Sequence, residues 1–290
     1  MARVTVGVLV LIVASGATVR LTGSGLGCPS VTVDLSACVK AYGARGYHAD
    51  IEFFNRVVSG LTVLVGLALA VAAWRTRGLG RRAKLLAVGA FAATFGQAPL
   101  GAVTVHYHLN PYLVISHLLL ALVALGLGVL ALLEADRAVE GAGEPLPRLA
   151  RLGGATLLAA VTVLVVSGTL STAAGRFPGS SGSTVVRRLW DFHSAVYWHV
   201  RAVAVFGVVL LALAAWAWRE RERFAWLLRG CAGLLALLLA QMAIGELQYR
   251  TYGTVPWGVV VVHVVLAAAL FAWTVGLVAR LWRPVRTGAT

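Results

Sequence analysis

Long apolar segments alternate with short polar segments along nearly the whole chain. A transmembrane helix needs about 20 mostly apolar residues, and eight segments meet this requirement. The pattern therefore predicts an all-α integral membrane fold with eight transmembrane helices. We expect the spans near residues 4–19, 51–74, 85–105, 112–133, 153–171, 189–218, 228–247 and 257–281.

The first apolar segment has a second interpretation, because a secretory signal peptide is also a short apolar stretch near the N-terminus. Such a peptide ends in a small-residue cleavage site. Here the apolar stretch runs instead into Arg20, followed by Leu-Thr-Gly-Ser-Gly. We therefore expect a true membrane span.

The composition excludes a soluble globular domain, since 59% of the 290 residues are hydrophobic and only 12% are charged. A net charge of +14 would suit a nucleic-acid partner, but most of the basic residues fall in the loops on one side of the predicted spans. The positive-inside rule then places both termini in the cytoplasm, and the charge orients the protein in the lipid bilayer. The scarcity of lysine among the basic residues, with much Ala, Gly and Val, is typical of a GC-rich bacterial genome and indicates a bacterial cell membrane.

The second half of the chain repeats polar residues of the first about 145 residues later. A duplicated four-helix unit predicts two pseudo-symmetric four-helix bundles, related by an axis along the membrane normal. We expect bundles at residues 1–134 and 152–290, joined by a polar cytoplasmic linker at 135–151. The repeated pairs are His48 and His193, Arg56 and Arg201, Gln97 and Gln241, Gly101 and Gly245, and His117 and His263.

The fourth span of each half carries one of these histidines: His117 follows Asn110-Pro111, and His263 follows Pro256. A histidine inside a membrane is costly and normally faces a partner, a cavity or a cofactor. Imidazole nitrogens are good axial ligands for haem iron, and helix bundles commonly hold haem. The alternative is a histidine that hydrogen-bonds a neighbouring helix or lines a proton path, but two at repeated positions favour haem.

The second span of the first half carries an acidic residue, Glu52, on the helix face shared by His48 and Arg56. A carboxylate in the bilayer is costly unless it is paired, and the second half has Tyr197 in its place. This asymmetry predicts that one site reacts while the other serves it. The alternative is a Glu52–Arg56 ion pair that only holds helices together.

Two cysteines, Cys28 and Cys38, fall in the first loop on the outer side. An oxidising extracytoplasmic environment favours a disulfide bond between them, and the alternative is two free thiols. Cys231 falls within the seventh span, where the simplest interpretation is a small buried apolar residue.

Several motifs together resemble the haem A synthase family. Gly16-Ala-Thr-Val-Arg20-Leu-Thr-Gly-Ser-Gly-Leu-Gly-Cys28-Pro29 is similar to its first outer segment, and Glu52-Phe-Phe-Asn55-Arg56 to its Glu-x-x-His-Arg motif. The segments that begin at Gln97, Asn110 and Ser167 also resemble the family, so the likeness covers nearly the whole chain.

The resemblance implies an enzyme that oxidises a ring methyl group of haem O to a formyl group by successive hydroxylations, for the cofactor of cytochrome oxidase. It implies a haem b cofactor in the C-terminal half and substrate haem in the N-terminal half. By the same resemblance Glu52 takes part in the chemistry, and His117 and His263 are two of the family's histidine ligands. The implied partners are a haem O synthase and an electron carrier, and a homo-oligomer stays open.

The chain departs from the family at Asn55, which replaces the histidine of the second-span motif. His48 lies seven residues earlier, close to two helical turns, and so shares the helix face of Asn55. In the second half, the repeat favours His193 as the haem b ligand beside His263, and His199 is the rival because its depth matches His263 better. For the N-terminal site we expect His48, Asn55, Arg56 and His117.

Two other classes of protein fit parts of the pattern. A non-catalytic dihaem electron-transfer subunit predicts complete ligand pairs in both halves and has no need for Glu52. A transporter predicts helices broken near the bilayer midplane, for which Pro99 is the only clear candidate. The polar residues lie near the outer surface instead, which counts against transport.

Overall fold

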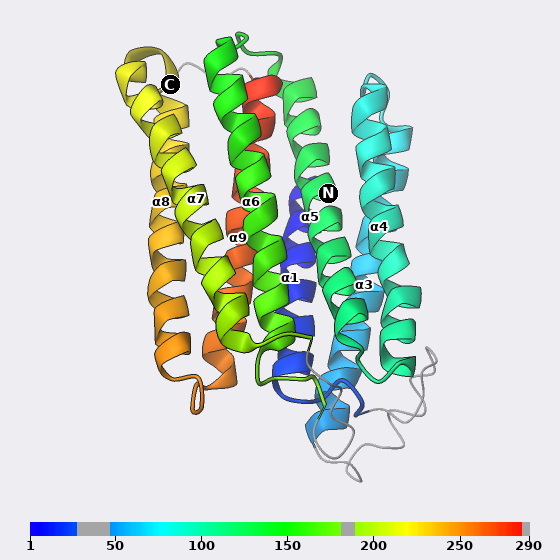
Figure 1. The fold of residues 1–290 in the computed structure, drawn as a ribbon. Helices are drawn as coiled ribbons and strands as arrows, with labels where there is room; N and C mark the ends of the chain where they lie inside the picture. The colour runs from blue at the N-terminus through cyan, green and yellow to red at the C-terminus, as the bar shows by residue number, and fades with distance from the viewer. Residues whose placement is uncertain (28–46, 181–188, 286–290) are drawn as a thin grey trace.

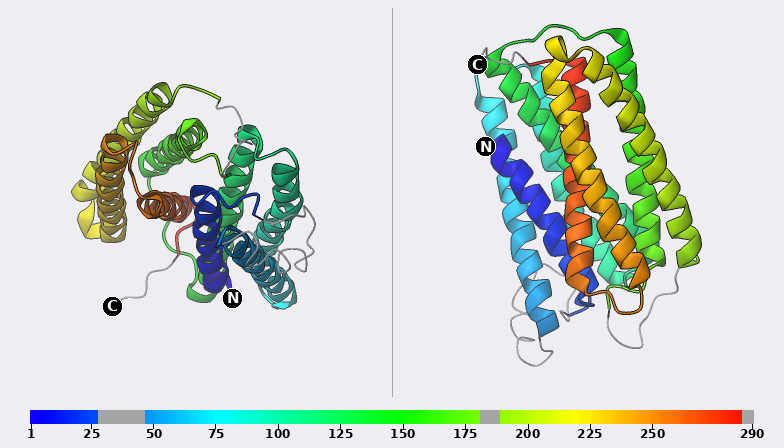
Figure 2. Two further views of the ribbon diagram at one scale, coloured as in Figure 1. Left: turned by 90° about the horizontal axis from the view of Figure 1, so that it is seen from below. Right: turned by 90° about the vertical axis from the view of Figure 1, so that its left-hand side faces the viewer.

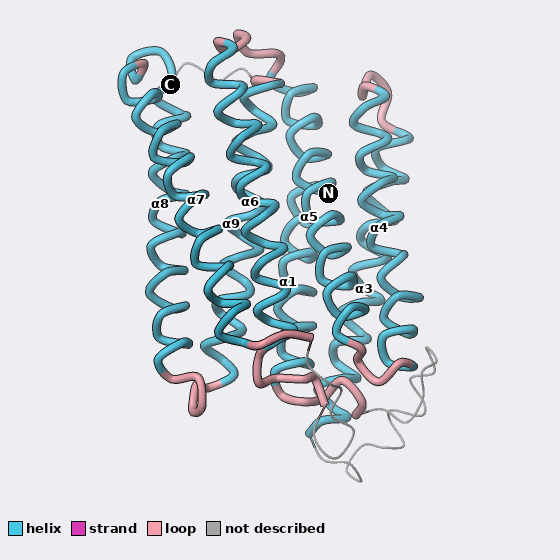
Figure 3. Tube along the Cα trace, in the orientation of Figure 1, coloured by secondary structure: helices cyan, strands magenta, loops and turns pink. Residues whose placement is uncertain are grey.

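The structure is a computed structural model that describes residues 1–27, 47–180 and 189–285. The described residues form eight long helices joined by loops, without a strand (Figures 1 and 3). Each helix is long and apolar enough to cross a membrane, which confirms the predicted all-α fold and its eight spans. The helices are α1 (Ala2–Leu21), α3 (Tyr47–Arg75), α4 (Arg81–His106), α5 (Pro111–Glu140), α6 (Arg148–Ala174), α7 (Phe192–Arg219), α8 (Arg221–Arg250) and α9 (Trp257–Trp282).

Seven of the helices contain their whole predicted span, and α7 begins later than predicted. Asp191 is its N-cap, and one carboxylate oxygen accepts the backbone N–H of Ser194 at 2.8 Å. An N-cap residue has a non-helical backbone, so the helix cannot start at 189. The same hydrogen bond lowers the pKa of the Asp191 carboxyl below its usual value. In the predicted linker only residues 141–147 are non-helical, because α5 and α6 extend into it.

The helices of each half form a ring in which every helix contacts two neighbours. One ring runs α1, α3, α4, α5 and the other α6, α7, α8, α9. Among the described residues, α3 and α5 do not contact each other, nor do α7 and α9, so these helices face one another across the two rings. The halves meet where α1 and α5 pack on α9 and where α5 packs on α6 (Figure 2, left).

The bundle has two distinct ends. The start of α1 and the end of α9 lie toward one of them, here called the terminal end (Figure 2, right). The opposite end, here called the loop end, carries the connections that lead into α5, α7 and α9 (Figure 1). Buried apolar side chains form a large cluster within the second half, which includes Phe206, Leu210 and Leu234. Two smaller clusters lie in the first half, and one of them, on α1 and α5, includes Ala268 of α9.

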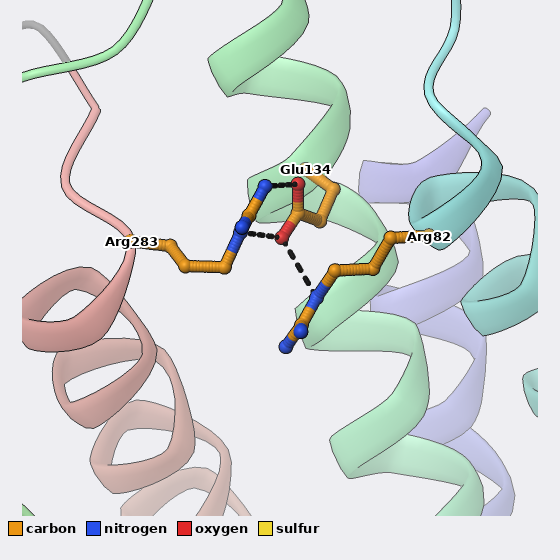
Figure 4. A network of polar contacts seen from close by, with 3 residues as sticks. All are labelled: Arg82, Glu134 and Arg283. Atoms are coloured by element: carbon orange, nitrogen blue, oxygen red, sulfur yellow. Dashed lines mark hydrogen bonds and ion pairs between the residues drawn. The ribbon is translucent and has the colours of Figure 1, made fainter.

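The halves are joined at both ends. At the terminal end, Glu134 of α5 forms ion pairs with Arg82 of α4 and with Arg283, which follows α9 (Figure 4). At the loop end, the backbone N–H of Gly25 donates to the carbonyl of Gly179 at 2.9 Å. A Cβ atom on Gly25 would lie 2.7 Å from that carbonyl oxygen, so this contact between the halves requires glycine.

Candidate functional site

Four polar side chains lie at similar depth below the loop end, one on each of the helices that face each other across the rings. His117 and His263 are six residues from the start of α5 and α9, His199 is seven residues from the start of α7, and Asn55 is eight residues from the start of α3. At 1.5 Å rise per residue, all four lie roughly 9–12 Å into their helices. Asn55 and His117 thus lie at similar depth on the facing helices of one ring, and His199 and His263 on those of the other.

The histidines of α5 and α9 are held in the same way. Gln97 on α4 donates its Nε2 to the backbone carbonyl of His117 at 3.1 Å, and Gln241 on α8 donates its Nε2 to the carbonyl of His263 at 2.9 Å. In both halves a glutamine one helix away thus fixes the backbone that carries the histidine. The repeated glutamines of the sequence are parts of the two sites.

The repeated glycines lie beside the same imidazoles. A Cβ atom on Gly101 would lie 3.3 Å from Cε1 of His117, and one on Gly245 would lie 3.5 Å from Cε1 of His263. The Nδ1 atoms of both histidines are buried and have no hydrogen-bond partner among the described residues. Nε2 is therefore the nitrogen that each imidazole can offer to a haem iron.

His199 on α7 is fixed by Ser167 on α6. The Ser167 hydroxyl donates to the carbonyl of Leu164 at 2.8 Å, and its oxygen lies 3.0 Å from Nδ1 of His199. Because the hydroxyl has one hydrogen, already used, Ser167 must accept the proton of Nδ1. Nε2 of His199 then keeps its lone pair, which is the form that binds iron. Gly168 leaves room for the ring, since a Cβ atom there would lie 3.1 Å from Cε1.

Asn55 on α3 occupies the corresponding place in the first half. Ser15 on α1 donates its hydroxyl to Oδ1 of Asn55 at 2.6 Å, as Ser167 on α6 contacts His199 on α7. Each serine is followed by glycine, Gly16 and Gly168. The structure thus pairs Asn55, the departure from the family motif, with His199.

His48 lies one residue from the start of α3, about 10 Å along the helix from Asn55. Its Nδ1 lies 3.0 Å from Oγ of Ser24, which lies 2.7 Å from Oγ1 of Thr22, and Thr22 donates to the carbonyl of Thr18 at 2.8 Å. Each hydroxyl has one hydrogen, so the bonds run in one direction, from His48 through Ser24 and Thr22 to Thr18. His48 therefore donates from Nδ1 and keeps a proton-accepting Nε2.

His193 lies equally close to the start of α7 and is exposed. Its Nδ1 lies 3.2 Å from the hydroxyl of Tyr249. The ring lines an open groove of about 430 Å³ on the surface of α7, together with Ser194, Tyr197 and Trp198. The depth of His193 in its helix does not match that of His263. The geometry therefore favours His199, the alternative that the sequence left open.

Glu52 is 4% exposed, and its Oε1 lies 2.7 Å from Nη2 of Arg56 one turn later in α3. A buried carboxylate is tolerated when it is paired and hydrogen-bonded, so the arginine keeps the charge of Glu52 in the bundle. Because both residues belong to α3, this ion pair by itself joins no two helices. At the equivalent place of α7, the guanidinium of Arg201 lies over the ring of Tyr197.

The cysteine predictions divide between two regions. Cys28 and Cys38 lie outside the described residues, so their disulfide stays a prediction. Cys231 is free and fully buried in α8, which confirms the prediction of a small buried residue.

Sequence reasoning missed the serines that orient the ring polar groups, Ser15 and Ser167, and the serine that orients His48, Ser24. The available signal was the Ser-Gly pair in the first span of each half. Single hydroxyls in apolar helices usually bond their own backbone, which hides such a signal among ordinary residues.

The residues of both rings fit a haem. Each offers an imidazole with an available Nε2, and glycine stands where a side chain would crowd the histidine ring. In the C-terminal ring two such imidazoles lie at similar depth on facing helices, and haem iron can be ligated by histidines from both sides.

Comparison with known proteins identifies the family of the chain. The family model of the cytochrome oxidase assembly proteins, COX15-CtaA, matches residues 46–275. Relatives named Heme A synthase include one from Geobacillus kaustophilus, 28% identical over 86% of this chain and 81% of its own length, and one from Staphylococcus saprophyticus, 24% identical over 94% and 92%. A third, from Staphylococcus haemolyticus, is 34% identical over 43% of this chain and 42% of its own length. The family predicted from the sequence motifs is thereby confirmed, and the chain belongs to the COX15-CtaA family of cytochrome oxidase assembly proteins.

Proposed function

We propose that this chain is a haem A synthase, a membrane enzyme that oxidises a methyl group of haem O to a formyl group. The observation that carries the proposal is the difference between two otherwise matched sites. The N-terminal ring has the buried, ion-paired Glu52, and the C-terminal ring has Tyr197 in its place. The names of the relatives support the same activity.

In the C-terminal ring, His199 and His263 would hold haem b, and Gln241 and Ser167 orient them. When bound, haem b supplies one-electron transfer to and from the substrate site. The residues of this ring would keep the cofactor in place, since Ser167 contacts the imidazole of His199 and Gln241 donates to the backbone carbonyl of His263. His193 is the alternative to His199, and exchanging each for alanine separates the two.

In the N-terminal ring, His117 would bind the iron of haem O, with Asn55 opposite and Arg56 beside Glu52. Each hydroxylation would replace a C–H bond of the methyl group by a C–OH bond, with water supplying the oxygen. Two electrons would leave the carbon for the electron carrier by way of haem b, and two protons would be released. The second hydroxylation gives a hydrate, which loses water to leave the aldehyde. Glu52 would offset positive charge that develops on this carbon, because a preorganised charge in a dry site acts strongly.

Protons released by the oxidation need acceptors that lead to the loop end. Glu52 and His48 stand one turn apart on α3, and Nε2 of His48 is left free to accept by the hydrogen bonds to Ser24 and Thr22. A proton taken up by Glu52 would leave through His48.

The same proposal assigns residues 1–134 to substrate binding and 152–290 to haem b, in a bacterial cell membrane with both termini cytoplasmic. The loop end then lies outside, where Cys28 and Cys38 would form a disulfide bond. A haem O synthase would supply the substrate, and an electron carrier would exchange electrons with haem b.

Extraction of the pigments from purified protein tests the activity directly. Haem b together with haem O or haem A is the expected result. If the extract contains haem b alone, even when the protein is expressed together with a source of haem O, the proposal is contradicted. That result indicates the rival dihaem electron-transfer subunit.

A further inference from the structure

The two rings use the same parts at every ligand position except one. Gln97 and Gln241 hold His117 and His263 through their backbone carbonyls, at 3.1 and 2.9 Å. The helix opposite carries a polar side chain that a serine of the adjacent helix contacts. That side chain is His199, contacted by Ser167 of α6, in one ring and Asn55, contacted by Ser15 of α1, in the other.

We infer that Asn55 faces the substrate iron on the side opposite His117, so that the protein supplies this iron with a single histidine. The inference rests on the proposed function, and it makes Asn55 a positioning residue of the substrate site. The C-terminal iron has two histidines, whereas the substrate iron keeps one axial position for a small ligand such as water.

His48 does not replace the missing imidazole. It lies about 10 Å along α3 from Asn55, and its Nδ1 is bonded to Ser24, which belongs to the loop after α1. To reach the depth of His117 it would have to break this bond, in a segment where a Cβ atom on Gly27 would lie 2.6 Å from the backbone carbonyl of His48. The backbone is thus packed against that loop.

The hydrogen bond from Ser15 gives Asn55 a defined direction. Ser15 donates to Oδ1 at 2.6 Å, so the amide nitrogen Nδ2, with its two hydrogens, is turned away from Ser15. An amide N–H beside an open axial position can donate to a small ligand on the iron. Histidine at this position would close that side instead.

The test is electron paramagnetic resonance of the oxidised protein, purified with haem b and saturated with haem O. The wild type is expected to show one low-spin signal, from His199 and His263, and one high-spin signal, from the substrate iron. Asn55→His is expected to turn the high-spin signal into a low-spin one with both haems retained. The matched exchange His199→Asn is expected to add a high-spin signal in the C-terminal half.

Ser15→Ala provides a second variant that keeps the ligand set. The substrate iron is expected to stay high-spin, while its affinity for cyanide falls roughly two- to tenfold, the effect of misdirecting one hydrogen-bond donor. Unchanged cyanide affinity overturns the direction assigned to Asn55.

Two results overturn the inference while the proposed function stands: two low-spin haems in the wild type, or a high-spin signal that Asn55→His leaves unchanged although both haems are bound. A protein that keeps haem b but takes up no haem O at saturation overturns the proposed function, and the inference with it.

Discussion

The N-terminal and C-terminal rings differ less in their frameworks than in the side chains that face their interiors. Both have a histidine whose backbone is fixed by a glutamine, a glycine beside the imidazole, and a serine that contacts the polar side chain on the helix opposite. The C-terminal ring completes this set with a second histidine, whereas the N-terminal ring has Asn55 and the ion-paired Glu52.

The two halves also differ in where their buried apolar side chains gather. The largest cluster lies within the second half and draws on all four of its helices. In the first half one cluster lies between α3, α4 and α5, and another, on α1 and α5, includes Ala268 of α9. The first half therefore packs partly against the second, whereas the second packs mainly within itself.

The largest effect on bound haem is expected when the glutamine-held histidine of one ring, His263 or His117, is exchanged for alanine. His263→Ala should lower bound haem b by more than about tenfold, since even indirect changes around metal ligands cost 10–100-fold. His117→Ala should keep haem b and lose haem O. Absorption spectra and extracted haems of both purified variants measure this. Equal loss of both haems in either variant would contradict separate sites.

A second test concerns the carboxylate that only one ring contains. Glu52→Gln keeps the shape and hydrogen-bonding atoms but removes the charge, so haem A formation should fall roughly 10²–10³-fold while haem b stays bound. Tyr197→Phe, at the equivalent place of α7, is the matched control and should keep most activity. Chromatography of extracted haems measures the product. If Glu52→Gln forms haem A at the wild-type rate, the charge has no part in the chemistry; if it loses haem b, Glu52 serves the structure.

The fold was predictable because transmembrane helices leave a strong signal. Seven spans fell within the observed helices, and only the start of α7 differed, where Asp191 caps the helix. The repeated Gln97 and Gln241 were also predictable, since a polar amide in an apolar helix needs a partner.

The sequence could not choose between His193 and His199 as the partner of His263, because position in the repeat and depth in the helix give different answers. A repeat of about 145 residues pairs His48 with His193, and both lie one residue from the start of their helices. His199 instead lies close to the depth of His263 and contacts Ser167. The geometry therefore favours His199, and the identity of the ligand stays a prediction.

A smaller effect is expected at the glycine that follows the serine in each ring, Gly16 after Ser15 and Gly168 after Ser167. Gly168→Ala would place Cβ 3.1 Å from Cε1 of His199, and such overpacking typically costs about 1–3 kcal/mol. Gly16→Ala is the matched control, because a Cβ atom there meets nothing within 4 Å. Thermal release of haem b, followed by absorbance, should occur at lower temperature in the first variant only. Equal shifts would mean that His199 does not depend on this space.

The smallest effect is expected at the terminal end, where an ion-pair cluster joins the halves far from both sites. Glu134→Gln weakens the pairing with Arg82 and Arg283, whose side chains are 58% and 42% exposed. Water can solvate both arginines, so the loss should be at most about 1 kcal/mol, or roughly 2–4 °C in the midpoint of thermal unfolding. Asp136→Asn is the control, since its contact with Arg3 is 3.6 Å long and Arg3 is 80% exposed. Haem content and product formation should stay at wild-type levels in both variants. A selective loss of haem O in Glu134→Gln would show instead that the contact between the halves shapes the substrate ring from the opposite end of the bundle.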